Sequence, residues 1–129
     1  MRLRNVVFMT VVLVFILTSP ALSQQWVDVK DPRDLKALHS NKTFKFTYMQ
    51  VPVVEHYRAD GKGIRISAQQ RDPFAWEVKG DQVCVVPYHD LTPCWQYQHS
   101  KKNPEEYVRR EPRHGIMQVI KVEEGIPEF

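Results

Sequence analysis

The hydrophobic positions of the chain begin with a run near its start. Arg2 and Arg4 precede residues 6–17, in which only Thr10 breaks the apolar run, and small residues follow at Ala21 and Ser23. A basic start, a short apolar stretch and small residues in this order are typical of a secretory signal peptide. A membrane-spanning helix would need about 20 apolar residues. The pattern therefore predicts cleavage after Ser23, a periplasmic or secreted protein, and no stable membrane span in residues 24–129.

A short helix is predicted near the start of the remaining chain, after a possible strand at residues 27–29. Asp31 can cap the first turn of a helix, and Pro32 suits the first helical position. Two apolar residues then lie three apart, so one face of the helix can dock on a core. These two residues are Leu35 and Leu38.

From residue 43 onward, hydrophobic positions alternate with polar ones, which is typical of half-buried strands. Asp60 and Gly61 can supply the positive φ angles of a hairpin turn, and Pro52 interrupts the alternation. The predicted strands cover residues 43–50, 53–58, 64–69, 74–79, 82–86, 94–99, 107–110 and 116–122. Their apolar faces are expected to carry Phe44, Phe46 and Tyr48, then Ile64 and Ile66, then Phe74, Trp76 and Val78.

These elements predict one small, mainly β domain. Short strands joined by turns favour an antiparallel meander that closes into a barrel or a sandwich. The one short N-terminal helix would cross one side of it or plug one end. The domain would span residues 24–129, with a flexible tail over about 123–129.

Cys84 and Cys94 are the only cysteines of the chain. In an oxidising compartment an even count predicts a disulfide, here between neighbouring strands across a loop at residues 87–93. A closed loop of about 11 residues would contribute about 3 kcal/mol in the chain-entropy account. The wide spacing differs from the Cys-x-x-Cys arrangement of redox pairs, so the bond is predicted to be structural.

The strand that starts at Cys94 can be oriented in two ways. If the cysteines face inward, Trp95 and Tyr97 face outward and, with Tyr88 in the preceding loop, form an aromatic binding surface. If instead Trp95 and Tyr97 belong to the core, the disulfide lies outside. The alternation alone allows both.

Charge does not point to nucleic acid as a partner. The formal net charge is +3, and Arg2 and Arg4 contribute two of these charges. A nearly balanced domain gives no electrostatic case for nucleic-acid binding. Locally, Arg109 and Arg110 are followed by Glu111, and this mixture is typical of a solvated face.

The sequence contains no pattern that is typical of an enzyme. It lacks a Gly-x-Ser-x-Gly elbow, and the glycines at 61 and 63 lack the helix and the residues of a phosphate-binding loop. No catalytic residue and no cofactor are predicted. His89, Asp90 and His99 are weak candidates for a metal site, because zinc needs three or four such ligands in a tetrahedral array.

A longer motif runs from Asp60-Gly61 through Trp76-Glu77-Val78-Lys79-Gly80-Asp81-Gln82-Val83-Cys84 to Cys94-Trp95-Gln96-Tyr97. It resembles the pattern of a family of small exported proteobacterial proteins with no assigned function. Asp72-Pro73-Phe74-Ala75 departs from it, where a glycine-rich lead-in is expected. The resemblance implies a bacterial envelope protein with a β-rich fold, and it carries over no catalytic residues.

Three functions are consistent with these patterns. The first is a non-catalytic exported module that binds an envelope protein or polymer through a sheet face or loop 87–93. The second is a small barrel that carries a lipid or another apolar small molecule. The third is a small metal-binding protein or enzyme. For the second function the ligand would lie among Phe44, Phe46, Tyr48, Trp76 and Val78.

Overall fold

The computed structural model describes residues 25–88 and 91–129. The predicted signal peptide, like His89 and Asp90, lies outside these residues. The elements in chain order are β1 (Trp26–Val29), α1 (Pro32–His39), β2 (Lys42–Tyr48), β3 (Val51–Tyr57), β4 (Lys62–Ser67), β5 (Gln70–Lys79), β6 (Gln82–Val86), β7 (Cys94–Ser100), β8 (Glu106–Glu111) and β9 (Ile116–Glu124).

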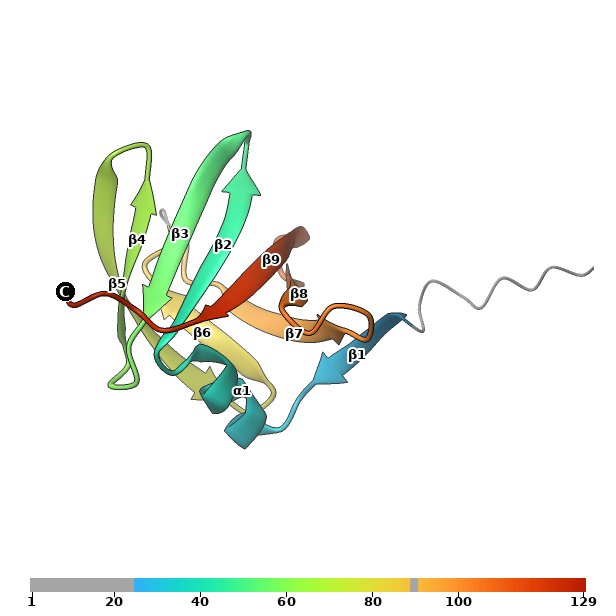
Figure 1. Cartoon of the computed structure of the whole chain (residues 1–129). Helices are drawn as coiled ribbons and strands as arrows, with labels where there is room; N and C mark the ends of the chain where they lie inside the picture. Colours follow the sequence, from blue (N-terminus) through green and yellow to red (C-terminus); the bar gives the residue numbers. More distant parts are fainter. Residues whose placement is uncertain (1–24, 89–90) are drawn as a thin grey trace, which may run out of the picture.

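The strands form a closed antiparallel meander barrel (Figure 1). Each strand from β2 to β9 pairs with the next one along the chain, and β9 pairs back with β2. The prediction of a mainly β meander is thereby confirmed, and the barrel is selected over the sandwich. Such closure pairs strand edges that an open sheet would leave exposed.

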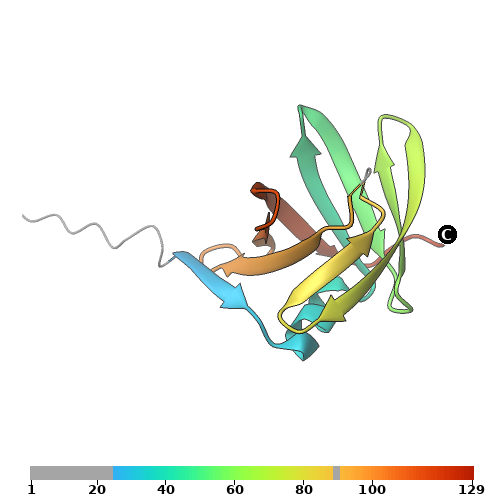
Figure 2. The same cartoon turned by 180° about the vertical axis from the view of Figure 1, so that it is seen from behind.

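Strand β1 is an addition to this barrel. It pairs with residues 97–100 of β7, whereas β6 pairs with Cys94 and Trp95 of the same strand. One edge of β7 is therefore shared by two strands. From behind, Figure 2 shows β1 running beside β7.

Helix α1 lies across one end of the barrel (Figure 1). It begins as predicted, because the Asp31 carboxylate accepts a hydrogen bond from the Arg33 N–H at 2.8 Å and Pro32 follows the cap. Leu35, Leu38 and His39 are its buried residues. The expectation that the helix docks through its two leucines is confirmed, and His39 joins them in the barrel.

Two hairpins with two-residue turns contain no glycine in the turn. Met49 and Gln50 connect β2 to β3, and Ala68 and Gln69 connect β4 to β5, all four with positive φ. Pro52, expected to interrupt the strand, lies within β3. It is tolerated because β3 pairs with β4 only from residue 53 onward, so the proline nitrogen needs no partner there.

The inward face of β4 is the opposite of the one predicted. Ile64 and Ile66 are only half-buried and face outward, whereas Gly63 and Arg65 are buried inside the barrel. The hairpin at Asp60-Gly61 sets a register in which Arg65 lies directly opposite Glu55 of β3. Because side chains alternate along a strand, this register turns the isoleucines away from the core.

The orientation of β7 is also settled. Cys84 and Cys94 are bonded to each other and lie opposite one another on β6 and β7, as predicted. Trp95 and Tyr97 face the interior and are almost completely buried. The interpretation of these two aromatic residues as an outward-facing surface is therefore wrong, and the alternative in which they belong to the core is confirmed.

The last strand is longer than predicted, since β9 continues through Glu124. Beyond it, the Gly125 N–H donates to the Asn41 carbonyl oxygen at 2.9 Å, and the Arg58 guanidinium donates to the Phe129 carbonyl oxygen at 2.7 Å. Glu123 and Glu124 are thus part of the sheet rather than of a tail. Among the described residues, no helix is long and apolar enough to cross a membrane.

Candidate ligand site at the open end of the barrel

Three charged side chains meet in the middle of the barrel. The Glu55 carboxylate lies between two arginines, with Arg65 Nε at 2.8 Å from one oxygen and Arg109 Nη1 at 2.9 Å from the other. The side chains of Glu55 and Arg109 are 0% exposed and that of Arg65 is 7% exposed. A buried ion pair needs good geometry and further hydrogen bonds to offset the loss of hydration.

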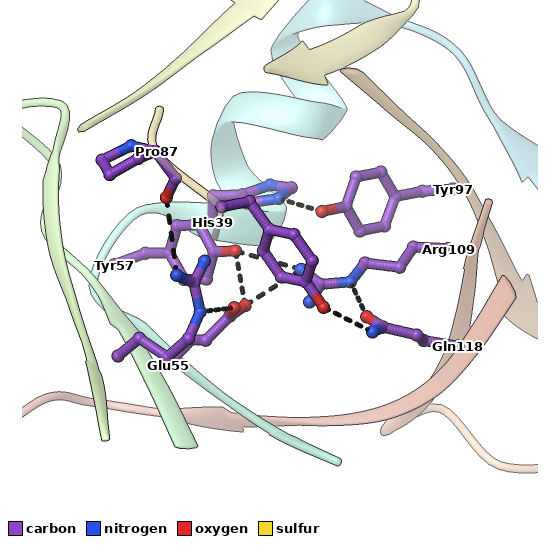
Figure 3. Close-up of polar contacts among 9 residues, drawn as sticks. His39, Glu55, Tyr57, Pro87, Tyr97, Arg109 and Gln118 are labelled. Atoms are coloured by element: carbon purple, nitrogen blue, oxygen red, sulfur yellow. Dashed lines mark hydrogen bonds and ion pairs between the residues drawn. The ribbon is translucent and has the colours of Figure 1, made fainter. Parts of the chain in front are cut away.

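Further hydrogen bonds surround this cluster (Figure 3). The Tyr57 hydroxyl donates to the Glu55 carboxylate at 2.8 Å, and Arg109 Nε donates to the Gln118 side-chain oxygen at 2.7 Å. The Gln118 amide nitrogen in turn donates to the Tyr88 hydroxyl at 2.8 Å. The network therefore links β3, β8 and β9 with the loop after β6.

The cluster carries more positive than negative charge. Burial raises the pKa of Glu55, but Arg109 and Arg65 outweigh this effect and bring the pKa to about 2, so the carboxylate is ionised at neutral pH. Each guanidinium is also ionised. One carboxylate thus faces two cations, and both Arg65 Nη2 and Arg109 Nη2 are buried without a hydrogen-bond partner in the described structure.

Glu111 is a second buried carboxylate, and it is satisfied separately. It accepts hydrogen bonds from the backbone N–H groups of Arg113 and His114 and from the His114 ring. Burial raises its pKa, but the hydrogen bonds from His114 and the backbone outweigh that effect, so the pKa is below its ordinary value. Among the described residues, no hydrogen bond or ion pair joins Glu111 to Arg65 or Arg109.

His39 lies on the α1 side of this network. Its Nδ1 lies 2.8 Å from the Leu35 carbonyl oxygen, which can only accept, so Nδ1 carries the proton. The Tyr97 hydroxyl then donates to Nε2 at 2.9 Å. Burial lowers the pKa of His39 to about 3. The ring also stacks on Trp76 with centroids 5.3 Å apart, so this end of the barrel is filled.

The opposite end of the barrel contains a cavity of about 250 Å³. Its lining includes Met49 and Ala68 of the β2–β3 and β4–β5 turns, and these hairpin tips lie far from α1 (Figure 1). Arg65 is the one charged residue in its lining, and most of the other side chains are apolar or aromatic. The full lining is Phe46, Tyr48, Met49, Val51, Val53, Arg65, Ser67, Ala68 and Tyr88.

A groove lies beside this cavity, between β2 and β9. These strands pair only from Lys42 to Lys45 of β2, so Phe46–Tyr48 diverges from Ile116–Ile120. The groove between them has a volume of about 720 Å³. Apolar side chains in or near it that are well exposed are Met49, Met117 and Val119.

The residues singled out from the sequence are distributed unevenly around the site. Tyr88 lines the cavity. Trp95 lies deeper, with Arg109 over its ring at 4.4 Å, and Tyr97 contacts His39 rather than the cavity. His99 is partly buried on β7, with its ring 6.2 Å from that of Tyr107. The described residues contain no group of three metal-ligating side chains, and the other two candidates of the predicted metal site lie at 89–90.

The charged cluster was not predicted from the sequence. Arg109 was assigned to a solvated face and is instead fully buried. The cross-strand register could have indicated the ion pair of Glu55 and Arg65. Counting residues back from the Asp-Gly turn places Glu55 opposite Arg65, on the face of the sheet that carries Tyr57. An opposite-charge pair on an otherwise apolar face is a sign of a buried ion pair.

Comparison with protein-family models, curated proteins and solved structures found no match to this chain. The resemblance to the family of small exported proteobacterial proteins therefore remains an expectation.

Proposed function

We propose that this protein binds a small, largely apolar molecule in the cavity at the open end of its barrel. The cavity itself carries the proposal. Ligand sites are concave and mainly apolar, with a few polar groups that fix orientation, and this lining combines aromatic and aliphatic side chains with Arg65.

The size of the ligand follows from what fills the barrel. Of the residues expected to hold a ligand, Phe44 and Trp76 are packed around His39 at the α1 end, whereas Phe46 and Tyr48 line the cavity. A volume of about 250 Å³ corresponds to roughly eight water volumes. A ligand with a body of about eight carbon atoms fits this space, and a long lipid chain would extend beyond it.

The alternative of an exported module that binds a protein or polymer has less support. Its aromatic surface was to include Trp95 and Tyr97, which are buried. Binding of a small apolar molecule is therefore the better supported of the two proposals.

Two variants of one strand test this proposal. Ser67 lines the cavity, so Ser67→Phe should fill it, whereas Ile64→Phe places the same ring on the outer face of β4. The probe is 1-octanol, titrated into the oxidised protein labelled with ¹⁵N and followed by NMR. We expect saturable shifts of the amides of residues 46–51, 53 and 65–68 in the wild type and in Ile64→Phe, and their loss in Ser67→Phe. Equal shifts in the two variants, or none in the wild type up to the solubility of the probe, would contradict the proposal.

A further inference from the structure

We infer that the ligand of this cavity is a monoanion whose carboxylate binds Nη2 of Arg65. This inference rests on the proposed function and adds the charge and the head group of the ligand.

The contacts of Arg65 leave one direction of its guanidinium free. Nε donates to Glu55, and Nη1 lies 3.4 Å from the Pro87 carbonyl oxygen, whereas Nη2 has no hydrogen-bond partner in the described structure. The guanidinium carbon Cζ also lies over two aromatic rings, 4.5 Å from the centroid of Tyr88 and 5.1 Å from that of Phe74. A guanidinium donates in its own plane, so the position left for a ligand is an acceptor at the Nη2 edge.

Arg65 is both buried and part of the cavity lining. Its side chain is 7% exposed, so water cannot hydrate Nη2 well, and leaving a buried donor of a charged group unpaired is costly. Arg109 Nη2 is likewise unpaired, but this residue lies deeper and is not part of the lining. An acceptor that enters the cavity reaches Arg65 first.

The net positive charge of the buried cluster predicts the charge of the ligand. Glu55 neutralises one of the two arginines, and Glu111 is held separately by the backbone and His114. An isolated buried charge is unfavourable, and one negative charge on the ligand would remove the excess. A carboxylate also matches the geometry of a guanidinium. The apolar lining then accommodates a short hydrocarbon or aromatic body.

The test compares three probes with the same eight-carbon chain: octanoate, 1-octanol and octylammonium. Titration calorimetry and the NMR assay above are run at pH 7, where Glu55 is ionised and His39 neutral. We expect octanoate to bind at least tenfold more tightly than 1-octanol, because a hydrogen bond between charged groups is stronger than one between neutral groups. Octylammonium should bind more weakly than 1-octanol.

Arg65→Lys keeps a cation beside Glu55 but removes the planar guanidinium group with its several N–H donors. It should lower the octanoate affinity much more than the 1-octanol affinity, because only the carboxylate loses a charge-assisted hydrogen bond that matches the guanidinium geometry. Arg71→Lys, at an exposed position of β5, is the control and should change neither. The three-probe comparison uses only the wild type, so it remains decisive if Arg65→Lys does not fold.

The outcomes separate this inference from the proposed function. If 1-octanol and octanoate bind in the cavity with equal affinity, the charge inference is overturned and the carrier proposal stands. Tighter binding of octylammonium, or octanoate shifts that lie away from residues 46–53 and 65–68, would also overturn it. If none of the three probes binds, the proposed function fails and this inference fails with it.

Discussion

The buried imidazole of His39 makes the stability of the fold depend on pH in a specific window. Burial lowers the pKa of His39 from an ordinary value of 6.5 to about 3. Between these two values the unfolded chain binds a proton that the folded protein excludes. The stability that the neutral His39 contributes is therefore complete above pH 6.5 and is lost progressively as the pH falls from 6.5 to 3.

The size of this effect follows from one excluded proton. Each pH unit within the window changes the free energy of unfolding by about 1.4 kcal/mol. From pH 7.5 to pH 5 the loss should amount to about 2 kcal/mol. Glu55 adds little over this range, because its pKa is lowered from 4.5 to about 2 and its contribution is lost only below about pH 4.5.

The perturbation is His39→Gln, which places a neutral donor and acceptor at the same position. Urea unfolding of the oxidised wild type and variant at pH 7.5, 6.5, 5.5 and 5 gives the difference in unfolding free energy. We expect that difference to shrink by about 2 kcal/mol between the first and last pH. Tyr97→Phe is the control, since it removes the hydrogen bond to Nε2 but keeps the imidazole, and it should cost about 1 kcal/mol at every pH. Parallel pH profiles for wild type and His39→Gln would refute the argument.

Three further predictions concern stability and are checked by urea or thermal unfolding. Glu55→Gln leaves two buried guanidinium groups without their carboxylate and should destabilise the protein by about 3–5 kcal/mol; a loss under 1 kcal/mol would contradict this. Gln69 has a φ of 72°, so Gln69→Gly should stabilise the β4–β5 turn by about 1 kcal/mol, and an unchanged melting temperature would oppose it. Replacing Cys84 and Cys94 by serine should cost about 3 kcal/mol, and a double variant as stable as the oxidised protein would contradict the structural assignment of the bond.

The order of elements could be predicted because local signals determined it. Asp31 and Pro32 mark the start of α1, and the Asp-Gly turn and the two-residue periodicity mark the hairpins. By contrast, the turns at 49–50 and 68–69 contain no glycine, so their boundaries lacked a sequence signal.

The candidate site could not be predicted in the same way. Hydrophobicity alone placed Ile64 inside, whereas register places Arg65 there. Arg109 belongs to the same cluster although it lies 54 positions from Glu55. Only closure of the barrel brings these strands together, and that information is absent from any local window of the sequence.

The unequal pairing around the barrel has a mechanical consequence. The shortest pairing is that of β6 with β7, which share two residue pairs, and β2 with β9 share four, as do β7 and β8. The Cys84–Cys94 disulfide links β6 and β7 covalently, whereas no covalent bond links β2 to β9. We therefore expect β6 and β7 to stay together when the barrel deforms, and β2 and β9 to separate. The interior of the barrel would then widen first between β2 and β9, where Phe46 and Ile120 border both the groove and the buried core.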